Sequence, residues 1–175
     1  MKDFPVFTTE NGVASLILKE IPYRKEAYIH LRDASNPQVL LDECVSFCRV
    51  CGAEKIYASG HELLERYLLH TAVVEMRGIP NIDETLLESL FPVTEATVAR
   101  WREIHNRAMA QVPNAGTLEA RDEAALTQGG AYFIHRDGEL LGIGYLKEDC
   151  VQVIAAAQPG AGKRVLHSLC SVCPG

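Results

Sequence analysis

The feature that most constrains the fold of this chain is a glycine-rich, basic loop between an apolar strand and a helix. The strand predicted over Val151–Ala157 runs directly into Gln158-Pro159-Gly160-Ala161-Gly162-Lys163-Arg164, where an amphipathic helix begins. Glycine lets the backbone approach a ligand closely, and a helix start offers unpaired N–H groups at the positive end of its dipole. With the charges of Lys163 and Arg164, these features predict a binding site for a pyrophosphate group, which we call the seat. A tight strand-to-helix turn that only requires glycine explains the loop alone equally well.

Neither of two common phosphate-binding motifs fits this loop. A P-loop, Gly-x-x-x-x-Gly-Lys-Ser/Thr, matches Gly162 and Lys163 but finds Ala157 in place of its first glycine and Arg164 in place of its hydroxyl residue. A dinucleotide-binding Gly-x-Gly-x-x-Gly motif finds Val165 in place of its third glycine. The loop therefore predicts a phosphate seat of another kind.

The residues before the loop predict two helices followed by antiparallel strands. A helix is expected over 94–109, and a polar helix over 118–128. The pair Asp137-Gly138 lies between expected strands at 131–135 and 140–146, which is a typical hairpin signal. The residues expected on the buried face of the first helix are Val98, Trp101, Ile104 and Ala108.

The first half of the chain alternates expected strands and helices. Asn36-Pro37 is typical of a helix start, and Gly52 is placed to end that helix. The breakers in Gly78-Ile79-Pro80-Asn81 mark a boundary. We therefore expect an α/β half-domain over 1–78, a linker over 79–90 and a core domain over 91–175. The strands of the first half are expected over 13–21, 26–31, 55–58 and 72–76, and its helices over 37–51 and 61–68.

Three motifs stand out in this second half: Trp101-x-x-Ile104-x-Asn106-x-Ala108-Met109, Leu141-Gly142-Ile143-Gly144-Tyr145 and the run Val153–Gly162. With these motifs, the order of elements over about residues 91–175 resembles the GNAT family of N-acetyltransferases. The resemblance implies an α/β (α+β) class and a GNAT-like acyl-CoA N-acyltransferase fold, with a mixed, mostly antiparallel sheet flanked by helices. The first half resembles the back half of such a domain more faintly, through the helix ending at Gly52 and the strand expected over 70–76; an unrelated α/β lobe explains it equally well.

The resemblance implies acetyl-CoA as co-substrate and transfer of its acetyl group to an amine of a small molecule or a protein. The usual pattern Gln/Arg-x-x-Gly-x-Gly/Ala is altered here, because Ala157 stands at its first position and Gln158 follows one residue later. A non-catalytic acyl-CoA-binding or interaction module is the alternative. The residues implied are Val153, Ile154 and Ala155, whose backbone would bind the pantetheine arm, and Gly160, Ala161, Gly162, Lys163 and Arg164, which would hold the pyrophosphate.

No catalytic residue is assigned from the sequence. Some relatives carry a glutamate base near the start of the cofactor strand, where this chain has Gln152. Glu148 and Asp149 are expected in a solvated turn, and His105 is expected on the surface. Family members continue past this helix into a strand and a Leu-Tyr-x-x-x-Gly-Phe signature, whose tyrosine commonly protonates the thiolate. We therefore expect the C-terminal part of the domain to be incomplete in this sequence.

Composition and charge limit the classes of partner and the cell compartment that we expect for this protein. The net charge of −6 disfavours nucleic acid, and no run approaches the about 18 consecutive apolar residues of a membrane span. With no secretory leader, we expect a cytoplasmic protein. An amine acceptor and a homodimer remain open as partners.

The cysteines raise a competing hypothesis of a zinc site. Cys48-x-x-Cys51 and Cys170-x-x-Cys173 have four-thiolate spacing. Cys44, however, continues the same helix face as the first pair, so apolar packing explains these positions fully. We expect core cysteines and no metal.

Overall fold

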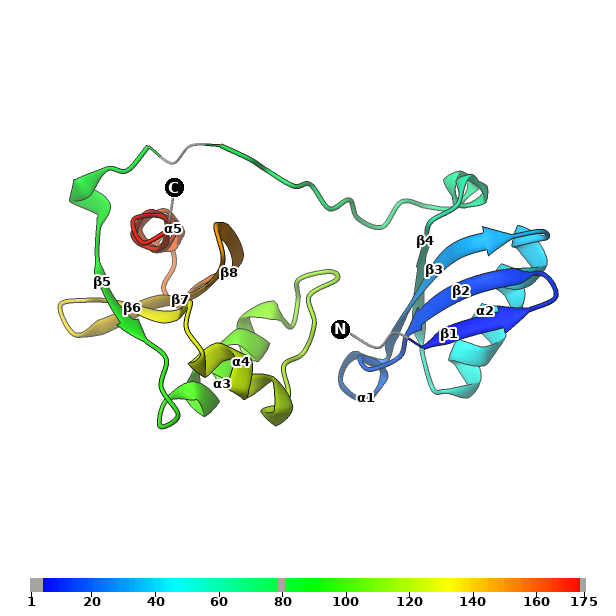
Figure 1. Ribbon diagram of the computed structural model, residues 1–175, viewed down its shortest axis with the longest axis horizontal. Helices are drawn as coiled ribbons and strands as arrows, with labels where there is room; N and C mark the ends of the chain where they lie inside the picture. The colour runs from blue at the N-terminus through cyan, green and yellow to red at the C-terminus, as the bar shows by residue number, and fades with distance from the viewer. Residues whose placement is uncertain (1–4, 79–80, 174–175) are drawn as a thin grey trace. The chain divides into compact units, whose positions relative to one another are not determined.

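The computed structural model describes residues 5–78 and 81–173. The chain divides into two compact units, Met1–Val74 (unit 1) and Glu75–Gly175 (unit 2). Each unit contains a four-stranded sheet, and across the two sheets a single strand pair is parallel in the described residues. With five α-helices in the same residues, the fold is mixed α/β (Figure 1). None of the described helices is both long and apolar enough to cross a membrane.

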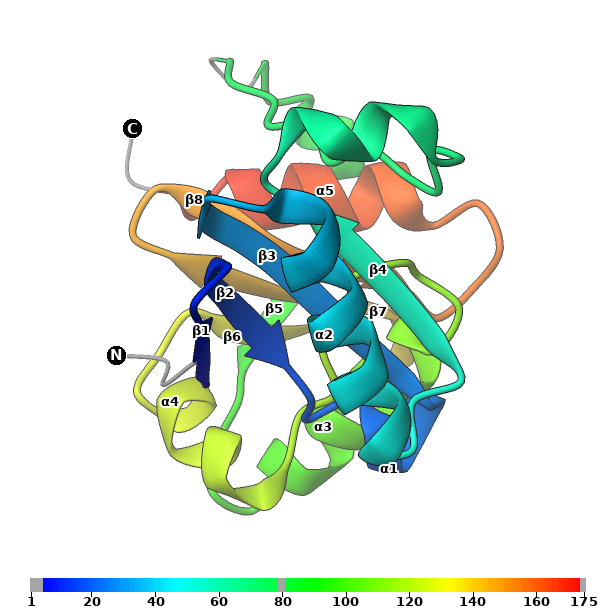
Figure 2. The ribbon, with the colours of Figure 1, turned by 90° about the vertical axis from the view of Figure 1, so that its right-hand side faces the viewer.

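Unit 1 is built on a sheet in the order β1-β2-β3-β4, in which β3 and β4 are parallel. Helix α2 makes the crossover that a parallel pair requires, and Figure 2 shows it lying across the sheet. The elements are β1 (Val6–Thr9), β2 (Gly12–Ile17), α1 (Ile21–Arg24), β3 (Glu26–Ala34), α2 (Pro37–Val50), β4 (Lys55–Ser59) and the 3₁₀ helix η1 (Glu62–Arg66).

Helix α2 forms where the sequence predicts it. Asn36 caps its start and accepts a hydrogen bond from Val39 N at 3.4 Å. Gly52 follows its end with a φ of 95°, a conformation that favours glycine. The apolar face of α2 packs on β2 and β3 and forms the core of unit 1. The helix residues in this core are Leu40, Leu41, Cys44 and Cys48.

Two predicted strands of unit 1 differ in the structure. The strand predicted over 13–21 is shorter in the structure, where β2 ends at Ile17. Its last predicted residue, Ile21, begins the single-turn helix α1 instead. The strand predicted over 72–76 is wrong, since residues 67–78 carry neither helix nor strand. A β-prone composition does not suffice there, because a strand forms only against a partner.

Unit 2 is built on an antiparallel sheet in the order β5-β6-β7-β8, with helices on both faces. Trp101 of α3 is fully buried in one cluster with Ile143 of β7, and Val165 of α5 is fully buried in another with Ile134 of β6. The elements are η2 (Glu84–Leu86), β5 (Ser89–Pro92), α3 (Val98–Met109), η3 (Ala120–Asp122), α4 (Glu123–Thr127), β6 (Ala131–Arg136), β7 (Glu139–Lys147), β8 (Cys150–Ala156) and α5 (Gly162–Cys170).

Several elements of unit 2 differ from their predicted extent. Most of η2 and β5 falls within the residues predicted to form a linker, 79–90. Strand β5 has only four residues, too few for a periodic pattern, and its Pro92 suits a strand at a sheet edge. The polar helix predicted over 118–128 is a 3₁₀ turn followed by the short helix α4. On α3, Ala108 is exposed although it was expected on the buried face.

Two glycines of β7 allow α5 to lie close to the sheet. A Cβ atom on Gly142 would lie 2.7 Å from Val165 Cγ2, and one on Gly144 would lie 2.7 Å from Leu169 Cδ2. Real Cβ atoms essentially never approach other atoms so closely, so a side chain at either position would force its neighbours to shift. The packing of α5 on β7 fixes where the loop between β8 and α5 begins and ends.

Candidate functional site

The loop between β8 and α5 is held by hydrogen bonds at both ends. Gln158 Nε2 donates to the Leu140 carbonyl oxygen at 3.2 Å, and Ala161 N donates to the Gln158 carbonyl oxygen at 3.2 Å. Gly160 has a φ of 81°, which favours glycine. The unusual position of Gln158 therefore has a structural role, since its side chain ties the loop to β7.

The first turn of α5 presents unpaired N–H groups beside this loop. The first hydrogen bond into the helix runs from Val165 N to the Ala161 carbonyl oxygen at 3.0 Å, so the amides of Gly162 and Lys163 have no partner within the helix. A Cβ atom on Gly160 or Gly162 would meet no described atom within 4 Å, so the space beside the loop is open. The Lys163 side chain is exposed. This arrangement suits an anion.

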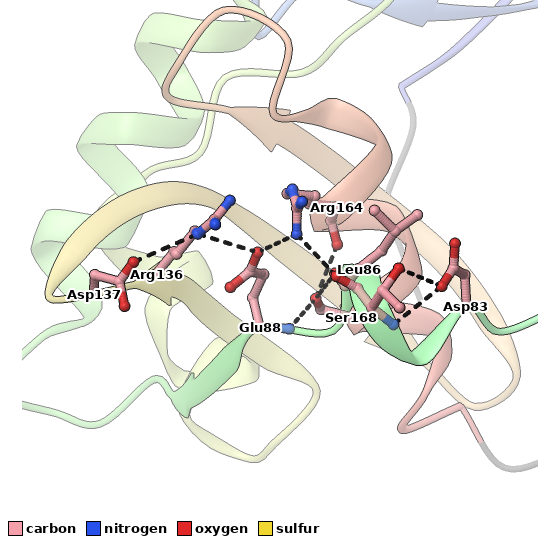
Figure 3. A network of polar contacts seen from close by, with 8 residues as sticks. Asp83, Leu86, Glu88, Arg136, Asp137, Arg164 and Ser168 are labelled. Carbon is pink, nitrogen blue, oxygen red and sulfur yellow. Dashed lines mark hydrogen bonds and ion pairs between the residues drawn. The ribbon is translucent and has the colours of Figure 1, made fainter.

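Arg164 was predicted to hold the pyrophosphate, but its guanidinium group contacts the segment before β5. Arg164 Nη1 lies 2.7 Å from Glu88 Oε1 and donates to the Thr85 carbonyl oxygen at 3.2 Å (Figure 3). The Glu88 side chain is only 9 % exposed and also lies 4.0 Å from Arg136 Nε. Glu88 N donates to the buried Ser168 Oγ at 2.9 Å. The loop therefore brings together Gly160, Gly162 and Lys163 without Arg164.

A second contact between the same segment and α5 lies at Asp83. Asp83 N donates to His167 Nδ1 at 3.4 Å, and Thr85 Oγ1 donates to Asp83 Oδ1 at 2.6 Å. Hydrogen bonds from Thr85, with smaller contributions from the charges of Lys163 and His167, lower the pKa of the Asp83 carboxyl group. Sequence reasoning missed both features of Asp83: its cap on Thr85 has a local signal, an aspartate two residues before the capped amide, whereas its contact with His167 has none.

Strand β8 is the last strand of its sheet in the described part of the chain. The β7–β8 register and a 2.7 Å bond from Ala157 N to the Leu141 carbonyl oxygen fix which residues exchange hydrogen bonds. Because antiparallel strands alternate, Val153 and Ala155 direct their backbone groups toward β7. Among the three residues predicted to bind a pantetheine arm, Ile154 alone directs its backbone groups to the open edge.

The acid–base candidates named from the sequence lie in different environments. His105 was expected on the surface but is 5 % exposed, with its ring stacked on Trp101 at a centroid distance of 5.5 Å. Burial lowers the pKa of His105. Glu148 and Asp149 are exposed in the turn before β8, as expected. Gln152 is also exposed and cannot act as a base.

The cysteines divide between core and surface positions. Cys44 and Cys48 are fully buried, as predicted, and burial raises the pKa of Cys44 to about 11. Cys51 was expected on the same buried face but is exposed, whereas Cys170 is half-buried. Within residues 5–78 and 81–173, no group of three or more His, Cys, Asp or Glu side chains is placed to hold a metal ion.

The site thus combines a strand edge that can bind an extended chain with a helix start that can bind an anion. The loop joins the two through Gly160, which places them next to each other in sequence and in space. Comparison of this chain with family models, with curated proteins and with solved structures finds no match in any of the three.

Proposed function

We propose that the chain is an acetyl-CoA-dependent N-acetyltransferase whose unit 2 has a GNAT-like fold and whose co-substrate binds along β8 and the start of α5. One observation carries this proposal: the edge of β8 that no described strand pairs continues directly into a glycine loop and a helix start with N–H groups unpaired within the helix. Coenzyme A needs this combination, because its amide-bearing arm ends in a pyrophosphate. The order of hairpin, third strand, glycine loop and helix supports the GNAT-like fold.

In the proposed complex, the amides of Gly162 and Lys163 and the Lys163 ammonium group hold the pyrophosphate. The backbone groups of Ala156 and the carbonyl oxygen of Ile154 bind the pantetheine amides, as a sheet edge binds an added strand. Arg164 remains paired with Glu88 and keeps the first turn of α5 in place. The proposal thus changes the role expected for Arg164 from a ligand of phosphate to a support of the seat.

Acetyl-CoA would supply an acetyl group activated as a thioester. The neutral acceptor amine forms the new N–C bond, the C–S bond breaks, and the thiolate of coenzyme A leaves; the amine proton passes to solvent. The outward N–H of Ile154 is suited to donate to the carbonyl oxygen as negative charge develops. Without an assigned base, the rate enhancement rests on orientation of the two reactants.

A non-catalytic acyl-CoA-binding module is the second candidate. The observation that favours it is the placement of the acid–base candidates: Glu148 and Asp149 are exposed turn residues, and His105 is buried in α3. These placements leave the proposed co-substrate site without an assigned base.

Calorimetric titration of the full chain with acetyl-CoA tests the seat. Gly162→Ala places a methyl group in the open space of the seat at a position without a positive φ. We expect it to weaken binding at least about tenfold, the effect of losing roughly 1.4 kcal/mol of anion binding at a helix start. Gly78→Ala is the matched control, because its Cβ also meets no described atom within 4 Å. Absence of binding at high micromolar acetyl-CoA, or equal affinity of both variants, would refute the seat.

Release of free thiol from acetyl-CoA then separates the enzyme from the binding module. A panel of small amines and amine-bearing peptides is incubated with the protein, and coenzyme A is measured with a thiol reagent in filtrates free of protein. Amine-dependent release that Gly162→Ala reduces and Gly78→Ala preserves supports acetyl transfer. Binding without any amine-dependent release supports the non-catalytic module.

A further inference from the structure

Residues 67–76 gather exposed apolar side chains in a segment without helix or strand. Leu68 is 96 % exposed and Met76 is 90 % exposed. Contiguous exposed apolar groups of this kind mark interaction sites in soluble proteins. The large exposed hydrophobic residues of the segment are Tyr67, Leu68, Leu69, Val73, Val74 and Met76.

The sequence of this segment has the period of a strand. Glu75 and Arg77 share one side, since Arg77 Nε lies 2.8 Å from Glu75 Oε1. The opposite side of an extended chain carries no Asp, Glu, Lys or Arg, so covering it would bury no such charge. The residues on that side are Leu68, His70, Ala72, Val74 and Met76.

The middle of the segment lies at the edge of unit 1's sheet. The His70 ring stacks on Tyr57 of β4 at a centroid distance of 4.5 Å, and Tyr57 stacks on Tyr28 of β3 at 5.3 Å. These spacings are close to the roughly 4.8 Å between neighbouring strands. In the described residues β4 ends its sheet, so His70 occupies the position where one more strand would pair.

We propose that residues 67–75 form a docking strand that pairs antiparallel with the same residues of a second copy of this chain, about a two-fold axis at Thr71. In this register Leu68 lies opposite Val74 of the second copy, and Leu69 lies opposite its Val73. The Tyr67 hydroxyl faces a Glu75 carboxylate at each end. The second copy is the occupant because the four large aliphatic residues of the strand, Leu68, Leu69, Val73 and Val74, all pair with one another in this register. A two-fold pairing also closes on itself, which an open stack of strands does not.

Disulfide trapping tests the register. In a background in which the exposed Cys51 and Cys150 are replaced by serine, Thr71→Cys would place two thiols opposite each other across the axis, with Cβ atoms about 4.5–5.5 Å apart. We expect a covalent dimer of the Thr71→Cys variant under mild oxidation. Peptide mass mapping should show that its disulfide joins position 71 of the two copies. Thr8→Cys, at an exposed threonine of β1, is the control and should remain monomeric. Equal cross-linking of both variants, or none at position 71, would overturn the register.

Sedimentation velocity tests the dimer without cross-linking. The wild-type chain should form a discrete dimer at tens of micromolar, and Val74→Lys should raise its dissociation constant at least about tenfold, because the two-fold axis counts each lost pair twice. Val50→Lys is the matched control, since Val50 is 87 % exposed on α2, and should dimerise like the wild type. A monomeric wild type, open-ended aggregation, or equal effects of the two lysines would contradict the proposal.

Discussion

Replacing Gly142 by alanine tests the close packing of α5 on β7. The added Cβ would lie 2.5 Å from the Ala155 carbonyl oxygen and 2.7 Å from Val165 Cγ2. The carbonyl oxygen belongs to the backbone of β8 and cannot rotate away, so strands or helix must shift. Overpacking of this kind costs about 1–3 kcal/mol, and the better conformational preference of alanine returns about 0.5–1 kcal/mol. The difference between these two terms spans about 0–2.5 kcal/mol. Because the nearest contact is a backbone atom, we expect Gly142→Ala to lower the free energy of unfolding by about 1–2 kcal/mol, in the upper part of that span.

Urea unfolding followed by the fluorescence of Trp101 measures this change in unit 2, because Trp101 is the only tryptophan of the chain. With a slope of about 2 kcal/mol per molar urea, the midpoint should fall by about 0.5–1 M. The three atoms nearest to a Cβ on Gly144 all belong to the Leu169 side chain, so Gly144→Ala should cost less. Gly162→Ala, whose Cβ meets no described atom within 4 Å, should not lower the midpoint. An unchanged midpoint for Gly142→Ala would refute the packing of α5 against this glycine.

Three further predictions concern titration, reactivity and the ion pair beside α5. Burial lowers the pKa of His105 from its usual 6.5, so the unfolded chain binds this proton more readily. The contribution of neutral His105 to the free energy of unfolding should be fully present above about pH 6.5 and be lost as the pH falls below that value. His105→Gln should therefore reduce the loss of urea midpoint at low pH. Because burial raises the pKa of Cys44 to about 11, a thiol reagent at about pH 8 should modify the exposed Cys51 at once and Cys44 only after unfolding; equal rates would argue against a buried Cys44. Glu88→Ala should lower the free energy of unfolding by about 1–3 kcal/mol by removing the carboxylate partner of Arg164, whereas Glu88→Gln, which keeps an acceptor, should lose less. Equal midpoints for both Glu88 variants would show that the ion pair contributes little.

Local signals predicted the elements whose formation depends on neighbours in sequence. Asn36 and Gly52 bound α2 as expected, because capping and positive φ involve only residues within a few positions. Asp137 and Gly138 form the predicted hairpin turn with φ values of 52° and 84°. The start of α5 at Gly162 likewise follows from the glycine-rich loop before it.

Predictions failed where distant partners decide the outcome. Val73 and Val74 have strong β propensity but no strand beside them in the described residues, so no ladder forms. Strand β5 forms from a short, weakly patterned stretch because β6 offers it an edge. The error at His105 is of another kind, because His105 lies one turn after Trp101 and stacks on it, so the helical period already places both residues on one face.

The sequence by itself determined the succession of strand, glycine loop and helix at residues 150–170, together with the unpaired amides at the start of α5, because both follow from backbone preferences within a few residues. Only the tertiary structure decided which groups at this site are free to bind. Arg164 pairs with Glu88, 76 positions away in the chain, and the register with β7 turns Val153 and Ala155 inward while it leaves Ile154 at the edge. Charge pairing and strand register depend on residues that are distant in sequence, so no local pattern could have separated Lys163 from Arg164.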